Sequence, residues 1–127
     1  PECVLCHRPI RQRLCFEVEF YRVLNDSFVG GYNAIVTGCV HAYCLKRVLS
    51  DRYAVFVYQI PRDQPCLICG DALLHDLSVV RARVCTPSLS LQSLQHTYAW
   101  SIYHRECLLR VLELDNPVET MIMAGYA

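Results

Sequence analysis

The sequence predicts a small α+β fold built from two tandem repeats, and an internal duplication is the main observation that predicts it. The nine residues that begin at His41 recur at His104, 63 positions later, with the His, Cys, Leu, Arg, Val and Leu in register. The same offset relates the Cys-x2-Cys at Cys3 to the one at Cys66. Each repeat therefore reads Cys-x2-Cys-x34-His-x2-Cys and continues into a stretch with helical periodicity.

The repeated residues are of the types that bind zinc. Zinc prefers four Cys or His ligands in a tetrahedron, and a site in which the protein fills all four positions is structural rather than catalytic. Ordinary buried cysteines and histidines are the alternative, but two matching blocks at one offset argue against it. The sequence therefore predicts two zinc ions, one per repeat, with the ligands Cys3, Cys6, His41 and Cys44 in the first and Cys66, Cys69, His104 and Cys107 in the second.

The duplication divides the 127 residues into two predicted domains, 1–62 and 63–127. Halves of this size bury little apolar surface alone. Because 54% of the residues are hydrophobic, the chain is globular rather than disordered. We expect a metal ion in each half, and packing between the halves, to supply the stability that two small cores lack.

In the first repeat the Cys-x2-Cys predicts a zinc knuckle, and a β-hairpin follows it. From Leu14 to Leu24 apolar residues alternate with polar ones, with Phe16, Val18 and Phe20 on one face, as is typical of a half-buried strand. Residues 25–27 and the Gly-Gly at 30–31 indicate turns, and residues 32–37 are predicted to form the return strand.

The second half of the chain predicts further strands. Residues 53–60 are rich in β-branched and aromatic residues and form a predicted strand that could tie the two repeats together. Pro61 and Pro65 bracket a short hinge. After the second knuckle we expect strands at 79–84 and 98–103, separated by a Ser- and Gln-rich loop at 86–97.

Three helices are predicted. Two ligands three residues apart on a first helical turn point the same way, so each His-x2-Cys can begin a helix and close its site. These helices run to Leu49 in the first repeat and from His104 to Leu114 in the second. A short C-terminal helix, residues 117–124, is predicted from Asn116 as N-cap and the Pro that follows it.

Charge and composition exclude several classes of partner and location. Twelve basic and twelve acidic residues give a net charge of zero, which argues against nucleic-acid binding. No apolar run reaches the roughly 20 residues of a membrane span. Nine cysteines, an odd number, and no visible signal peptide favour zinc-bound thiolates in a reducing compartment, so we expect an intracellular protein, in the cytoplasm or nucleus.

Three cysteines, Cys15, Cys39 and Cys85, lie outside the repeat. Cys39 could be an alternative ligand of the first site or a nucleophile beside His41, but a zinc-bound His41 cannot act as a base. For Cys39 the default interpretation is a buried structural thiol, and the sequence assigns no role to Cys15 or Cys85. No phosphate-binding loop, catalytic triad or paired carboxylate appears in the sequence, and no catalytic residue is predicted.

Each half resembles the first-site half of a RING finger, and so a treble-clef zinc module. The resemblance rests on Cys3-Val4-Leu5-Cys6 with His41-x2-Cys44-Leu45, and on the equivalent residues of the second half. A RING finger interleaves two sites in one domain. A single RING threaded through this chain would draw its ligands from Cys3, Cys6, Cys39, His41, Cys44, Cys66 and Cys69. It would lack a Cys at Arg47, and it would leave His104 and Cys107 unused. Two single-zinc RING-like modules are therefore the preferred interpretation.

The resemblance implies functions that involve other proteins. In RING-type ubiquitin ligases, the apolar residue corresponding to Leu5 or Ile68 helps to dock the conjugating enzyme. The helix faces around Arg47 and Arg110 are the other expected partner surfaces. The leading hypothesis is a non-catalytic protein-interaction or assembly scaffold that binds protein partners or forms a homo-oligomer. Small viral proteins use similar paired modules, so a viral structural or accessory protein, in a virion or an infected cell, is one form of it. The alternative is a RING-type ubiquitin ligase or ligase adaptor.

Overall fold

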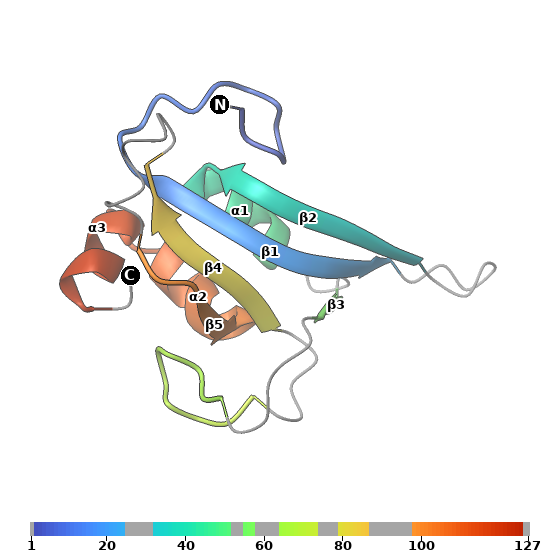
Figure 1. Cartoon of the computed structure of the whole chain (residues 1–127), viewed down its shortest axis with the longest axis vertical. Helices are drawn as coiled ribbons and strands as arrows, with labels where there is room; N and C mark the ends of the chain where they lie inside the picture. The colour runs from blue at the N-terminus through green and yellow to red at the C-terminus, as the bar shows by residue number, and fades with distance from the viewer. Residues whose placement is uncertain are drawn as a thin grey trace.

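The residues that the structure describes form one antiparallel sheet with three helices, an α+β architecture as predicted (Figure 1). The computed structural model describes residues 2–24, 32–51, 55–57, 64–73, 79–86 and 98–125. The elements in chain order are β1 (Cys15–Leu24), β2 (Tyr32–Val40), α1 (Ala42–Leu49), β3 (Val55–Val57), β4 (Val79–Cys85), β5 (Ser101–His104), α2 (Arg105–Leu112) and α3 (Pro117–Met123).

The predicted hairpin is formed by β1 and β2, which pair antiparallel from Phe16 opposite Val40 to Leu24 opposite Tyr32. The alternation in the sequence sets the orientation of β1, because Phe16, Val18 and Phe20 are all fully buried. The return strand is three residues longer than predicted, since pairing continues through Gly38 as far as Val40.

The three helices lie where their patterns predict them, with small differences at the ends. α1 and α2 are each eight residues long and occupy equivalent positions of the two repeats. His41 and His104 are their N-caps, with extended backbone, and do not form the first helical residue. α2 ends at Leu112, two residues earlier than predicted. α3 has Asn116 as N-cap residue and Pro117 in its first turn, as the sequence indicates.

The two repeats share a single sheet because β1 pairs with β4. The strand order is β2-β1-β4-β5, and β3 also pairs with β1. In the β1–β4 register Val18 lies opposite Ala82, and the next pair is Glu19 opposite Arg81. The 63-residue offset relates Val18 to Arg81 and Glu19 to Ala82, so exchanging the two repeats turns one of these pairs into the other. An approximate two-fold axis therefore passes between them and relates the two halves of the molecule.

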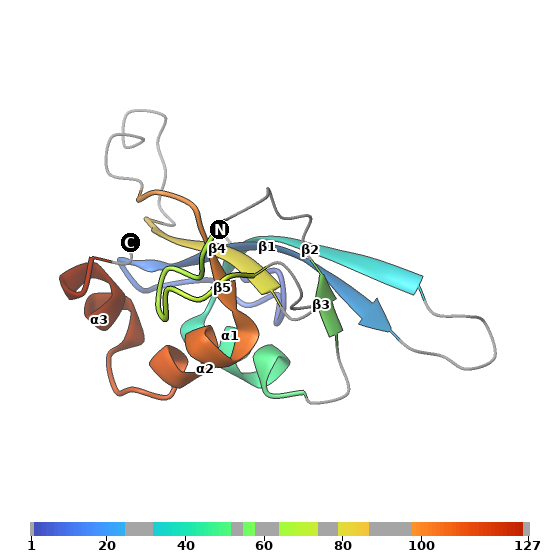
Figure 2. The same ribbon diagram turned by 90° about the horizontal axis from the view of Figure 1, so that it is seen from below.

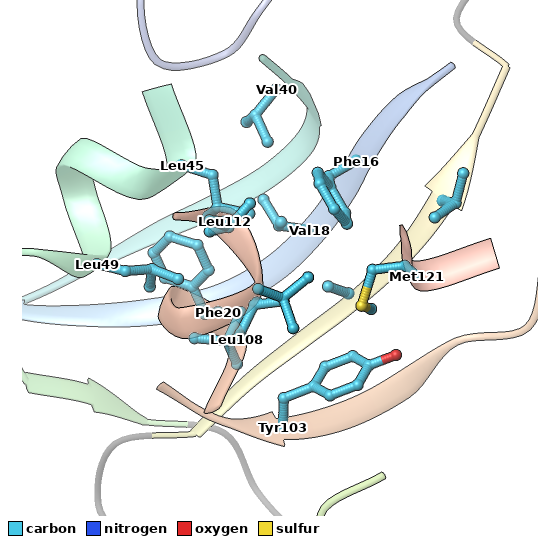
Figure 3. Packing of buried hydrophobic residues seen from close by; sticks show 14 of the residues in the cluster. Phe16, Val18, Phe20, Val40, Leu45, Leu49, Tyr103, Leu108, Leu112 and Met121 are labelled. Atoms are coloured by element: carbon cyan, nitrogen blue, oxygen red, sulfur yellow. The ribbon is translucent and has the colours of Figure 1, made fainter. Parts of the chain in front are cut away.

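One face of the sheet is covered by helices and forms the core (Figures 2 and 3). α1 and α2 lie side by side beneath the strands. Their buried leucines occupy equivalent places, Leu45 and Leu49 in α1 and Leu108 and Leu112 in α2, and they pack in one cluster with β1. The halves thus contribute to one hydrophobic core rather than to two.

The helices also contact each other through a polar group. Arg105, the first residue of α2, donates a hydrogen bond from Nε to the carbonyl oxygen of Leu49 at 2.8 Å, and another to the carbonyl oxygen of Asp51. A cation at the C-terminus of a helix binds unpaired carbonyl groups and stabilises the helix dipole. The start of one repeat's helix therefore caps the end of the other's.

The opposite face of the sheet carries charged pairs between β1 and β4. Arg81 contacts Glu19 at 2.7 Å and Arg83 contacts Glu17 at 2.8 Å. The guanidinium groups of both arginines lie over the ring of Trp100, 4.1 and 4.6 Å from its centroid. Exposed ion pairs contribute little, but these four side chains are partly covered and held by the register of the strands.

Several predictions from the sequence differ from the structure or fall outside the described residues. The last strand begins at Ser101, not at Tyr98, because only residues 101–104 pair with β4. Of the strand predicted at 53–60, residues 55–57 form β3. The turns at 25–27 and 30–31, most of the loop at 86–97 and the boundary between residues 62 and 63 lie outside the described residues. The two-domain division stays a prediction.

Replacing Gly38 with Ala should destabilise the fold. Gly38 has φ +130°, a conformation that L residues rarely adopt, and an added Cβ would lie 2.6 Å from Cγ1 of Val4 in the first knuckle. We expect Gly38→Ala to lower the free energy of unfolding by about 1–3 kcal/mol, measured by denaturant titration. Thr37→Ala, at an exposed neighbour in the same strand, is the matched control. Equal stability of the two variants would contradict this role of Gly38.

Candidate metal centres

The first knuckle is a tight turn that presents two thiols to the start of α1. The backbone N–H of Cys3 donates to the carbonyl of Arg8 at 3.0 Å, and that of His7 donates to the carbonyl of Cys3 at 2.8 Å. The turn requires a left-handed residue, and His7 adopts φ +62°. Val4 N–H donates to the carbonyl of Cys39 at 3.0 Å, which fastens the knuckle to β2.

The start of α1 supplies the other half of this cluster. Nδ1 of His41 lies 3.4 Å from Sγ of Cys6 and 3.7 Å from Sγ of Cys44. Zinc–sulfur and zinc–nitrogen bonds of about 2.3 and 2.0 Å place the ligand atoms of a tetrahedron roughly 3.6 Å apart, so both distances suit one ion. Nε2 of His41 lies 3.3 Å from the carbonyl oxygen of Pro9, which fixes the ring with Nδ1 toward the thiols.

The second cluster repeats this geometry at the same offset. Sγ of Cys69 and Sγ of Cys107 lie 3.3 and 3.8 Å from Nδ1 of His104. Gly70 adopts φ +79° in the position equivalent to His7, and its N–H donates to the carbonyl of Cys66 at 2.8 Å. The clusters differ in exposure, because Cys69 is exposed whereas its equivalent in the first cluster is half-buried.

The thiols in each cluster have opposite pKa shifts. Burial alone would raise the pKa of the Cys3 thiol, but hydrogen bonds from three backbone groups outweigh it and lower the pKa to about 6. The same balance lowers the pKa of Cys66 to about 7. Burial and neighbouring thiols raise the pKa of Cys44 and of Cys107 to about 12. Thiols so close together ionise jointly only if a cation neutralises them, and a divalent metal ion would do so.

All eight predicted ligands are therefore brought together in two groups, and the ligand atoms of each group lie within 4.8 Å of one another. Each group contains residues of one repeat only. This arrangement contradicts the single threaded RING, because Cys66 and Cys69 lie with His104 and Cys107 rather than with residues of the first half. Cys39 is not part of the first group, so it is no alternative ligand there.

A third group of thiols was not predicted as a cluster. Cys15 of β1, Cys39 of β2 and Cys85 of β4 also have their Sγ atoms within 4.8 Å of one another. The sequence could not show this, because the convergence depends on which strands pair. A weak signal exists in the alternation, since Cys15 precedes the outward-facing Glu17 by two residues and therefore shares its face.

The predicted partner residues line two open grooves at equivalent places in the repeats. Leu5 and Arg47 meet in a groove of about 330 Å³, and Ile68 and Arg110 in one of about 350 Å³. Each groove lies between the knuckle and the helix that hold one metal cluster. Every residue that lines the first groove has its equivalent, 63 positions later, in the lining of the second. The remaining lining residues are Cys6, Cys44, Val48 and Asp51 in the first groove and Cys69, Cys107, Val111 and Leu114 in the second.

Comparison of the chain with family models, with curated proteins and with solved structures finds no match. Among the described residues no helix is long and apolar enough to cross a membrane. The structure by itself therefore supports a coarse description. The chain is a small α+β protein with two clusters of three cysteines and one histidine, each positioned to hold a metal ion in the manner of a zinc finger.

Removing one thiol should release one metal ion and destabilise the sheet that both halves share. We expect Cys6→Ser and Cys69→Ser each to lower the metal content by about one ion per chain and to reduce the sheet signal in circular dichroism, because structural sites contribute much of the folding free energy. Elemental analysis after gel filtration measures the loss. Ser50→Ala, on the exposed end of α1, is the control. A full metal content in both Ser variants would contradict the ligand assignment.

Proposed function

We propose that the chain is a non-catalytic zinc-binding module that binds protein partners or assembles a larger complex. Zinc is the proposed ion because three sulfur atoms and one nitrogen atom in tetrahedral spacing are a typical set for structural zinc. With the protein supplying all four ligands, no position remains for a water or substrate. The metal then serves the fold, and function belongs to the surfaces that the fold presents.

The proposal includes the finer classification as two RING-like treble-clef modules, 1–62 and 63–127. It is supported by the order of knuckle, hairpin and helix in the first half and by the equivalent knuckle and helix in the second. A reducing intracellular location agrees with nine free thiols. A viral origin, or a place in a virion, stays a prediction of the resemblance alone.

The two equivalent grooves are the observation that carries the proposed interaction role. Each groove combines an apolar knuckle residue, Leu5 or Ile68, with the aliphatic part and charge of an arginine on the neighbouring helix. Arginine beside apolar surface is the composition that interfaces favour. Two ligands of the neighbouring metal cluster line each groove, so the shape of the groove depends on the metal centre as well as on the knuckle.

The second groove is the better candidate for binding an apolar segment. Leu114 is 49% exposed at its rim, and the equivalent place in the first groove is taken by Asp51. Leu67, on the same knuckle as Ile68, is 42% exposed. A partner with an apolar side chain for this groove and an acidic group for Arg110 fits the lining, whereas the first groove suits a more polar contact.

A RING-type ubiquitin ligase or ligase adaptor is the second candidate function. The observation in its favour is that Leu5 and Ile68, the residues that correspond to the docking position of RING ligases, line these grooves. Against it, Gly70 follows Cys69, where the resemblance calls for a basic residue.

Variants of the second groove test the interaction role. We expect affinity capture with the intact chain to retain a defined partner that Ile68→Ala and Arg110→Glu lose, because these changes remove an apolar side chain from the groove lining and reverse its charge. Met123→Asp, at an exposed site on α3, should retain it. Metal content must be equal in all four proteins.

Ile68→Ala, together with Leu5→Ala in the first groove, separates the two candidate functions. Ubiquitin chains formed with a panel of conjugating enzymes, and lost in Leu5→Ala or Ile68→Ala, would favour the ligase over the scaffold. The proposed interaction surface would be contradicted if the wild type and both groove variants captured the same proteins and the wild type showed no ligase activity.

A further inference from the structure

The nine cysteines of the chain divide into three clusters of three. Two of these clusters include a histidine and belong to the repeat. The third consists of Cys15, Cys39 and Cys85, none of which has a cysteine at the equivalent position of the other repeat. No duplication therefore explains this cluster, and it needs a separate reason.

Strand pairing fixes the third cluster on the face of the sheet opposite the helices. Cys15 lies directly opposite Cys85 in the β1–β4 ladder, and Cys39 lies opposite Glu17 in the β1–β2 ladder. Successive pairs alternate between faces, so all three thiols share the face of the Glu17–Arg83 ion pair. Three adjacent strands thus each supply one sulfur from a paired, rigid backbone position.

The sulfur atoms have the spacing of metal ligands. Sγ of Cys85 lies 3.4 Å from Sγ of Cys15 and 3.5 Å from Sγ of Cys39. These distances are too long for a disulfide bond of about 2.05 Å. They are close to the roughly 3.8 Å that separates two thiolates on one zinc ion with bonds of about 2.3 Å. If the three cysteines only filled apolar space, other small apolar side chains would serve equally well. Three strands would then not each need to place a sulfur atom at the same point.

We propose that Cys15, Cys39 and Cys85 form a third metal site that holds one thiophilic ion, Zn²⁺ or Cu⁺, through three thiolates. Soft thiolate ligands select these ions over magnesium or calcium. Among the described residues no other His, Cys, Asp or Glu joins the group. Cu⁺ would be satisfied by the three sulfurs, whereas Zn²⁺ would complete its tetrahedron with one ligand from outside the protein.

Burial gives the site one open side. Cys15 is 3% exposed and Cys85 is fully buried, whereas Cys39 is half-buried. The ion would therefore enter from the side of Cys39, and any external ligand of zinc would bind from the same side. Arg83 and its ion-pair partner Glu17 both lie near these thiols, so this pair adds no net charge that would balance the thiolates.

Metal counting on the intact chain tests this site. The protein is purified under anaerobic, reducing conditions, dialysed against excess Zn²⁺, and in a parallel sample given one equivalent of Cu⁺ with a competing chelator. We expect either a third zinc ion or one Cu⁺ beside two retained zinc ions, and a loss of about one ion per chain in Cys39→Ala. Cys15→Ala, which removes a buried thiol of the same site, should lose the same ion.

The number of zinc ions that each variant keeps distinguishes the third site from the two repeated sites. Both variants must keep two zinc ions, because Cys15 and Cys39 lie outside those clusters. Val36→Ala, at a half-buried position of β2, is the control and should keep all ions. Equal metal content of the wild type and Cys39→Ala would overturn the proposal, as would a Cys15–Cys85 disulfide found by mass spectrometry in the reduced, metal-loaded protein.

Discussion

The closure of each knuckle onto the start of a helix is the constraint on which the rest of the structure depends. Isolated helices of eight residues are unstable in water, because nucleation costs more than so few hydrogen bonds return. In this chain the N-cap histidine and the cysteine three residues later belong to a cluster that also contains the knuckle thiols. A metal ion there would hold the first turn of the helix in place before any packing occurs.

The two repeats, each with its knuckle closed onto a helix, are joined through the centre of one sheet. Because β1 and β4 are equivalent strands that pair antiparallel, an approximate two-fold axis relates the two halves, although β3 in the first half and α3 in the second fall at equivalent positions and differ. The leucines of α1 and α2 meet across this axis and bury a common core. Two halves that would each be marginal on their own thereby share their apolar surface. Metal at either cluster then supports strands that both halves need.

The sequence allowed much of this to be predicted, because the relevant signals are local or repeat along the chain. The alternation around Phe16, Val18 and Phe20 gave the buried face of β1, and the repeated spacing gave both groups of metal-type residues. The pairing of β1 with β4 was not predictable in the same way. It joins residues more than 60 positions apart and leaves no local pattern. The third thiol cluster depends on this pairing, and its members have no cysteine at the equivalent positions of the other repeat.

Departures from symmetry are where the two halves acquire different roles. Arg105 of α2 caps α1, but Ala42 takes the equivalent place in α1 and cannot return the contact. Leu114 and Asp51 make one groove apolar and the other polar. The metal clusters keep the common frame, so such substitutions can change a surface without changing the fold.

The central claim is that metal bound at the two repeated clusters supports the whole sheet, and removal of the metal tests it most directly. Amide proton spectra of the intact chain would be recorded before and after stripping with a strong chelator, and again after zinc is restored. The account predicts that the dispersed signals of β1 and β4 collapse together and return with zinc. A metal-free chain that keeps the dispersed spectrum of the folded sheet would contradict it.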